Sequence, residues 1–533
     1  MSEARLPKLI FNTDGNWMLH YLPDRDPSAV MKMLPDLVGS GVDCLSVLVG
    51  IDDDISWRGS PHAEMWGDAV EQWEVGNRTS SGGFAAERLK HLHDCMVAVI
   101  EDGRELMNIY IEGCRAAGVT PYASFRMNDA HTSGEKIEAH VRSRIKRDHP
   151  DWLIGPLIQA ETLGWQCGYS WQWDYAHEAV RNRFLGLIDE TLERYDFDGV
   201  EIDWMRQPPF FRPAEAYKHV DKLTDFMVRA REIVDRHARA RGRALTLVAR
   251  IAPDLDEAHT LGMDARAWMR RGLADIFVLG SASLTCPEMH LAEAIEHARS
   301  CSERDVRVYL GLEGAYRLSS PLEGFETSVP AAQRAVAHNA HADGVDGVYI
   351  FNYDQRGHRA GVVESQDMIE EHKQLLRDVT RPDALAASTR CYTVTSSMIG
   401  PNRSYAHGDP RPKLPRQLPI LAFGSGPRHA VPVRVADDVE AGLAAGRIKK
   451  IELRLRLTDH EDCMDRIVCE VNGERVDLND RPTVSNRWDD TWIQVDDAPV
   501  VQGGNNVLVA LDGHQVPDPW PVLNQCEIVL FGA

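Results

Sequence analysis

The sequence predicts a (β/α)₈ barrel followed by a smaller antiparallel β-sandwich. Three observations lead to this fold class. From residue 9 to about 380, short apolar runs alternate with longer amphipathic segments, a pattern typical of parallel strands joined by helices. Eight such runs occur, which is the number that closes this kind of barrel. After residue 445 the apolar residues instead follow short alternating runs, which are typical of antiparallel strands.

Each predicted barrel strand is a short run rich in β-branched and aliphatic residues. The helices between them show the expected spacing. After the fourth strand, for example, Leu223, Phe226 and Met227 belong to an apolar stripe, and Gly242 stands where that helix should end. In chain order the eight predicted strands are Leu9–Asp14, Val42–Gly50, Val119–Arg126, Gly199–Asp203, Ala244–Arg250, Asp275–Gly280, Val306–Glu313 and Val345–Asn352.

A chain of 533 residues is long enough for two domains. We expect the barrel over residues 1–380, a connector rich in proline and glycine over 381–445, and the sandwich over 446–533. Asn472-Gly473 predicts a hairpin turn in the last domain. The sandwich either supports the barrel or binds carbohydrate. Its predicted strands are Ile448–Leu457, Arg466–Val471, Thr491–Val495, Asn506–Leu511 and Glu527–Leu530.

Composition excludes several classes of partner. The chain has 59 Lys and Arg against 81 Asp and Glu, and this acidic balance argues against nucleic acids and anionic membranes. No apolar run reaches the roughly 20 residues that span a bilayer, and residues 1–8 lack the apolar core of a signal peptide. The ten cysteines form no C-x-x-C pair. Scattered thiols of this kind are typical of a reducing compartment, so we expect a cytoplasmic protein.

The fourth predicted strand carries two acidic residues on one face. Because side chains alternate along a strand, Val200 and Ile202 should face the helices, while Glu201 and Asp203 should point into the barrel. Two inward carboxylates are costly unless they are paired or hydrogen-bonded. Asp203 lies nearest the carboxyl end, where barrels of this type place their catalytic groups. We therefore predict Asp203 as a catalytic residue, whereas a buried salt bridge is the favoured explanation of Glu201.

The same alternation collects polar residues from other strands at this end of the barrel. Glu313 ends the inward face of the seventh strand, and Arg126 and Arg250 end those of the third and fifth. Glycosidic bond hydrolysis needs two carboxyl groups, one to donate a proton and one to attack or to activate water. Asp203 as nucleophile or base and Glu313 as acid/base meet this requirement. The predicted substrate-binding residues are Asp14, Trp17, Arg126, Asn128, Asp129, His131, Glu201, Trp204, Arg206, Arg250, Asn352 and Asp354.

Four segments carry a resemblance to a known family. They are residues 195–206 (YDFDGVEIDWMR), 124–131 (SFRMNDAH), 309–314 (YLGLEG) and 346–352 (DGVYIFN). They resemble segments of the bacterial family-10-like glycosyl hydrolase barrels, and the resemblance spans roughly residues 9–380. It implies a glycoside hydrolase that cleaves an oligosaccharide or another glycoside, without implying a particular sugar.

The fourth strand is also partly similar to the D-G-x-D-x-D-x-E strand of family 18 chitinases. Met205 replaces the final acid of that motif, so the proton donor must come from another strand. Glu313 is the candidate, with Asp354 and Asp129 as alternatives. Two other functions remain open, a polysaccharide lyase on the same barrel and a carbohydrate-binding barrel without catalysis. No H-E-x-x-H motif, cysteine cluster or phosphate-binding loop occurs, so the sequence indicates neither a metal nor a cofactor.

Overall fold

The computed structural model covers the whole chain and describes most of both domains. The described residues are 6–13, 37–50, 54–70, 86–129, 142–155, 171–212, 215–280, 285, 289, 291–313, 329–351, 366–395, 418, 420–421, 428, 430–478, 481, 483–485, 491–513 and 519–533.

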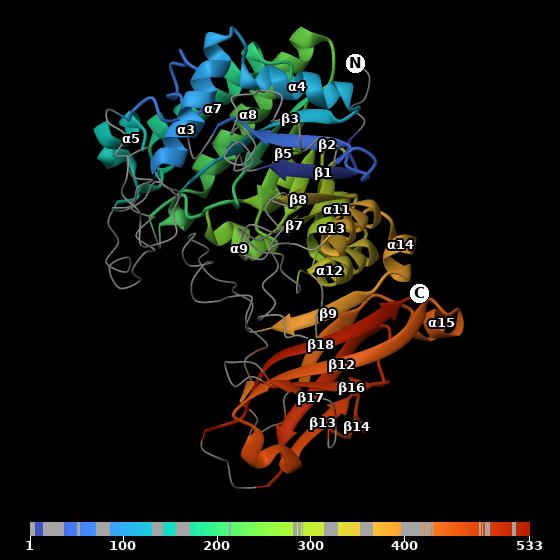
Figure 1. The fold of residues 1–533 in the computed structure, drawn as a ribbon. Helices are drawn as coiled ribbons and strands as arrows, with labels where there is room; N and C mark the ends of the chain where they lie inside the picture. Colours follow the sequence, from blue (N-terminus) through green and yellow to red (C-terminus); the bar gives the residue numbers. More distant parts are fainter. Residues whose placement is uncertain are drawn as a thin grey trace.

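Eight parallel strands form a closed barrel in which each strand pairs with the next and β1 pairs with β8 (Figure 1). This architecture confirms the fold class predicted from the sequence, and all eight predicted strands form within two residues of their expected ends. The strands are β1 (Leu9–Thr13), β2 (Cys44–Leu48), β3 (Thr120–Arg126), β4 (Gly199–Asp203), β5 (Thr246–Ile251), β6 (Ile276–Leu279), β7 (Arg307–Glu313) and β8 (Gly347–Phe351).

Helices surround the barrel and bury their apolar stripes against its outer surface. In α8 the stripe residues Leu223, Phe226 and Met227 are fully buried, and Gly242 ends the helix with a left-handed backbone at φ 67°. The α-helices of this part of the chain are α3 (Ala86–Glu101), α4 (Leu106–Ala116), α5 (Arg144–Asp148), α7 (Glu178–Arg194), α8 (Val220–Arg241), α9 (Leu255–Thr260), α10 (Ala265–Arg270), α11 (Ala292–Cys301), α12 (Val329–Asp343), α13 (Gln366–Asp378) and α14 (Pro382–Ala387).

The barrel has two separate apolar regions because strand side chains alternate between its faces. The larger region lies between the strands and the helices. The smaller one fills the barrel interior, where tyrosines accompany the usual branched residues. Its members are Ile10, Cys44, Tyr122, Val248, Ile276, Val278, Tyr309, Tyr349 and Phe351.

The second domain consists of two antiparallel sheets that enclose an apolar core. In one sheet the order is β10-β18-β12-β16-β15, with β9 also paired to β18, and in the other it is β11-β17-β13-β14. A short helix, α15 (Val439–Ala444), precedes β12. The strands are β9 (Arg390–Thr395), β10 (Ile420–Leu421), β11 (Ala430–Val435), β12 (Ile448–Thr458), β13 (Ile467–Val471), β14 (Glu474–Val476), β15 (Thr483–Ser485), β16 (Thr491–Asp496), β17 (Gly503–Leu511) and β18 (Val522–Gly532).

The segment 381–445, expected as a connector, differs from that expectation. Its strands β9 and β10 pair with β18, and β11 pairs with β17, so this segment contributes to both sheets. Pro432 obscures the strand pattern of β11 in the sequence. Proline is tolerated there because β11 lies at the edge of its sheet, where one side of the strand makes no ladder bonds.

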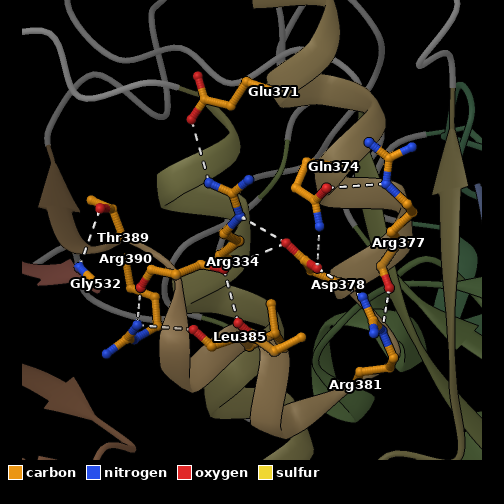
Figure 2. A network of polar contacts seen from close by, with 12 residues as sticks. Arg334, Glu371, Gln374, Arg377, Asp378, Arg381, Leu385, Thr389, Arg390 and Gly532 are labelled. Atoms are coloured by element: carbon orange, nitrogen blue, oxygen red, sulfur yellow. Dashed lines mark hydrogen bonds and ion pairs between the residues drawn. The ribbon is translucent and has the colours of Figure 1, made fainter. Parts of the chain in front are cut away.

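The two domains meet along α12, which packs on β9 (Figure 1). Ala331 and Ala332 of α12 contact Cys391 and Val529 of the sheet. Figure 2 shows the polar network beside this contact. Its centre is Asp378 at the end of α13, which accepts hydrogen bonds from Gln374 at 2.8 Å and from Arg381 at 3.0 Å.

The start of β9 is fixed to the preceding helix. Arg390 donates a hydrogen bond to the Leu385 carbonyl of α14 at 2.9 Å (Figure 2). Further along the junction, Arg434 of β11 binds both oxygens of Asp343 at the end of α12, at 2.6 and 2.8 Å. Side chains on both domains therefore anchor the sandwich to the barrel.

Candidate active site

Charged side chains gather inside the barrel at the carboxyl ends of β3, β4 and β5. In the strand register Arg126 lies opposite Asp203, and Asp203 lies opposite Arg250. All three point to the same inner face, and their exposed fractions are 6%, 2% and 2%. This is the end at which (β/α)₈ barrels carry their active sites.

Asp203 is held by donors on both of its carboxylate oxygens. Its Oδ1 accepts the backbone N–H groups of Met205 at 2.8 Å and Arg206 at 2.9 Å, and its Oδ2 accepts from the Arg250 guanidinium at 2.8 Å. These donors stabilise negative charge on the carboxylate and fix its orientation. The backbone of the turn that follows β4 therefore holds the carboxylate of Asp203, the last residue of that strand.

Arg250 links Asp203 to the far side of the barrel. Its guanidinium lies 4.4 Å from the centre of the Phe351 ring and 5.7 Å from that of Tyr349, both on β8. Burial would lower the pKa of Arg250, but the negative charges of Asp203 and Glu313 raise it above its ordinary value. Arg250 is thus a permanent cation among the acidic groups.

Glu313 ends β7, and its exposed fraction is 2%. Its backbone is fixed on both sides, because its N–H donates to Thr285 Oγ1 at 2.9 Å and its carbonyl accepts from the same hydroxyl at 3.0 Å. The Gln333 amide donates to that carbonyl at 2.6 Å. The charge of Glu313 acts on Arg250, which places this carboxyl group in the same electrostatic environment as Asp203.

Two further arginines lie at this end of the barrel. Arg126 pairs with Asp129, three residues along, and both side chains are buried. Arg206 follows β4, and its guanidinium lies 5.5 Å from the centre of the Phe351 ring on the opposite side of the barrel. The Phe351 ring therefore lies close to two guanidinium groups, those of Arg206 and Arg250.

Glu201 lies deeper than Asp203 and has no exposed surface. It accepts hydrogen bonds from Asn12 at 3.0 and 3.1 Å, from the Tyr349 hydroxyl at 2.7 Å and from Ser46. Burial and the charge of Asp203 raise the pKa of Glu201, although the three donors oppose this change. These neutral donors replace the salt bridge considered from the sequence. The role of Glu201 in substrate binding stays a prediction.

Trp204 lies on the other face of β4 from Asp203. It alternates with Asp203 and therefore points toward the helices, where it is fully buried. Its ring packs edge-on against Phe210, Phe226 and Tyr175 at centroid distances of 5.0, 5.3 and 5.4 Å. A tryptophan in this position belongs to the apolar core and offers no surface on which a sugar could stack.

Asn128 holds loops together through its side-chain amide. Its amide nitrogen donates to the carbonyls of Trp173 at 3.2 Å and Pro209 at 2.9 Å, and its oxygen accepts the Trp173 N–H at 2.8 Å. Both hydrogens of the amide are thus engaged by backbone groups. Asn128 fastens the loop after β3 to the segments around residues 173 and 209.

The remaining predicted site residues lie outside the described residues. Sequence reasoning did not select Ser46, Tyr349 and Phe351 as site residues, although the alternation of β2 and β8 places all three on the inner face. In the part of the chain that the structure describes, no three His, Cys, Asp or Glu side chains are grouped to hold a metal ion. No described helix is long and apolar enough to cross a bilayer. The predicted residues outside the description are Asp14, Trp17, His131, Asn352 and Asp354.

No family model and no curated protein matches this chain. Solved structures with a similar arrangement include an α-L-fucosidase, isoenzyme 2, from Paenibacillus thiaminolyticus, with 12% identity, a TM-score of 0.40, and coverage of 75% of this chain and 53% of that one. An α-galactosidase of family GH36 from Geobacillus stearothermophilus has 10% identity, a TM-score of 0.35 and coverages of 94% and 56%. Tryptophan synthase from M. tuberculosis has 12% identity, a TM-score of 0.30 and coverages of 71% and 93%.

This chain therefore spans about half the length of the fucosidase and of the galactosidase. The function of this chain must accordingly be argued from its own residues.

Proposed function

We propose that this chain is a glycoside hydrolase in which Asp203 and Glu313 are the catalytic pair. The observation that carries the proposal is the position of these two carboxyl groups. They end strands β4 and β7, lie within the electrostatic reach of Arg250, and are each 2% exposed. Hydrolysis of a glycosidic bond uses two carboxyl groups placed on either side of the bond.

The surroundings of Asp203 support its assignment as nucleophile or catalytic base. The described hydrogen bonds to its carboxylate come from two backbone N–H groups and the Arg250 guanidinium, and they hold both oxygens in a fixed orientation. Glu313 is the better candidate for the acid/base than Asp129, because Asp129 is fully buried and paired with Arg126. Asp354, the other alternative, lies outside the described residues.

Arg126 and Arg206 are the described residues that we propose for substrate binding, since guanidinium groups suit sugar hydroxyls and carboxylates. Arg250 has a second role, because it already supports Asp203. The proposed substrate-binding group also includes Asp14, Trp17, His131, Asn352 and Asp354. Trp204, Asn128 and Glu201 are left out of it for the reasons given above.

The test is turnover of a panel of 4-nitrophenyl glycosides and natural oligosaccharides by the wild type, Asp203→Asn and Glu313→Gln. We expect the wild type to release sugar, and each variant to lose at least about a thousandfold in kcat for a substrate with a poor leaving group. Asp346→Asn is a matched control, because it removes one carboxylate at the opposite end of the barrel. It should retain turnover. Azide should restore activity to the variant that lacks the nucleophile and yield a glycosyl azide.

Two outcomes would replace the proposal. A product that absorbs ultraviolet light, formed at an undiminished rate by Glu313→Gln, would indicate a lyase that leaves an unsaturated sugar. No turnover on the whole panel, together with a glycan that raises the melting temperature of the wild type and Asp203→Asn equally, would indicate a binding protein.

A further inference from the structure

A carboxyl group lies in the part of the barrel interior that apolar and aromatic side chains otherwise fill. Glu201 is fully buried two residues before Asp203 and on the same strand face. Val248, Val278 and Tyr122 belong to the same interior. A buried carboxylate is strongly unfavourable unless donors compensate for the loss of water, so its presence here calls for a role.

The donors to Glu201 come from strands on the other side of the barrel. Asn12 of β1 reaches both oxygens, Ser46 of β2 donates to Oε2, and Tyr349 of β8 donates to Oε1 at 2.7 Å. Asn12 also donates to Ser124 of β3 at 3.1 Å. One carboxyl group therefore ties β4 to β1, β2 and β8 directly beneath the candidate catalytic centre.

Tyr349 connects this buried group to Asp203. Its hydroxyl is fixed by Glu201, and its ring lies 5.7 Å from the guanidinium carbon of Arg250. Arg250 in turn donates to Asp203 Oδ2 at 2.8 Å. The contacts thus form one continuous series from Glu201 through Tyr349 and Arg250 to Asp203.

We propose that Glu201 is a positioning residue for Asp203 that acts by holding Tyr349 and, through the Tyr349 ring, the Arg250 guanidinium. The inference rests on the proposed function for its effect on catalysis. Glu201 itself touches no substrate, because it is fully buried. Its loss should release the Tyr349 ring, let Arg250 move away from Asp203, and weaken the step that uses the Asp203 carboxylate.

The kinetic test compares Glu201→Gln, Tyr349→Phe and the double variant on a 4-nitrophenyl glycoside that the wild type hydrolyses. We expect kcat per folded molecule to fall at least tenfold in each single variant while KM stays within about twofold, since the substrate contacts are intact. Because Glu201 and Tyr349 act through the same series of contacts, the kcat of the double variant should fall no further than that of the more impaired single variant. Ile276→Ala is the control, because it opens space in the same interior while Ile276 pairs in the strand register with Val248 and Arg307, outside this series of contacts. Its kcat should not change.

A structural test decides the proposal independently of activity. Crystal structures of Glu201→Gln and Tyr349→Phe should show the Arg250–Asp203 contact lengthened beyond hydrogen-bonding distance, with the contact unchanged in Ile276→Ala. An intact contact in both variants, an unaltered kcat in Glu201→Gln, or losses that multiply in the double variant would each overturn the proposal. If the wild type turns over no glycoside, the proposed function fails, and the Arg250–Asp203 distances still decide whether Glu201 has this positioning role.

Discussion

The Arg250 guanidinium donates a hydrogen bond to Asp203 Oδ2 at 2.8 Å, and its carbon lies 4.4 Å from the centre of the Phe351 ring. Both charged side chains are buried. A buried ion pair of this kind depends on both partners, because either charge alone lacks compensation for the water that it has lost.

Arg250→Met should therefore destabilise the protein by about 3–5 kcal/mol, because it leaves the Asp203 carboxylate without its cation. Urea unfolding of the wild type and the variant at pH 7 measures the difference. Asp203→Asn/Arg250→Met removes both charges and should be more stable than Arg250→Met alone. A double variant that is even less stable than Arg250→Met would show that loss of the ion pair does not explain the loss of stability.

A substitution at Trp204 distinguishes a role in core packing from a role in substrate binding. Trp204→Phe should cost about 1–3 kcal/mol, since it removes buried ring area and the hydrogen bond from Nε1 to Met227 Sδ. KM for any substrate should remain unchanged, because the ring points away from the barrel interior. Thermal melting and steady-state kinetics on the same preparations give both quantities. A KM that rises severalfold at unaltered stability would restore Trp204 to the substrate site.

Trp204 shows how much of the site can be predicted from the sequence. Alternation along β4 is local, so it correctly separates Asp203 and Glu201 from Val200 and Ile202, and the same rule places Trp204 outside. The prediction that Trp204 binds substrate depends instead on its place beside a catalytic candidate. The barrel itself was predictable because apolar periodicity is also local.

The partners of buried groups could not be predicted in the same way. Glu201 meets Asn12 and Tyr349 across 189 and 148 residues of chain, so the contacts depend on how the barrel closes. The alternation of side chains along β1 and β8 shows that these residues face inward. It does not show which of them lie at the same height along the barrel axis. The strands of segment 381–445 were missed for a related reason, since β9 and β11 are defined by pairing with β18 and β17.

Asn128→Ala tests whether this residue holds loops together. The variant loses three hydrogen bonds to the backbone of Trp173 and Pro209, and should be destabilised by about 2–3 kcal/mol. Asn128→Asp is the informative companion, because it keeps the acceptor for the Trp173 N–H but cannot donate to the two carbonyls. We expect both variants to become more sensitive to proteolysis near residues 171–175. Weaker substrate affinity with unchanged stability and proteolysis would instead indicate a direct contact with substrate.

The surroundings of Asp437 predict how the stability of the junction between the domains changes at acidic pH. It accepts hydrogen bonds from Arg390 at 2.8 and 3.1 Å and from Tyr392 at 2.5 Å, and His338 of α12 lies 3.2 Å away. Burial alone would raise the pKa of Asp437, but the hydrogen bond with His338 and the charge of Arg390 lower it to about 2. A carboxyl group whose pKa is lowered by folding stabilises the native state above its unfolded pKa, and this contribution is lost as the pH falls toward 2.

The size of this contribution follows from the same shift. A change from 3.8 to about 2 corresponds to about 2 kcal/mol at neutral pH. Asp437→Asn should therefore be less stable than the wild type by at least about 2 kcal/mol at pH 7, and the gap should narrow between pH 4 and pH 2. Denaturant unfolding across this range measures it, with exposed Asp462→Asn as the control that should follow the wild type. A gap that stays constant down to pH 2 would mean that the ionised Asp437 does not stabilise the junction.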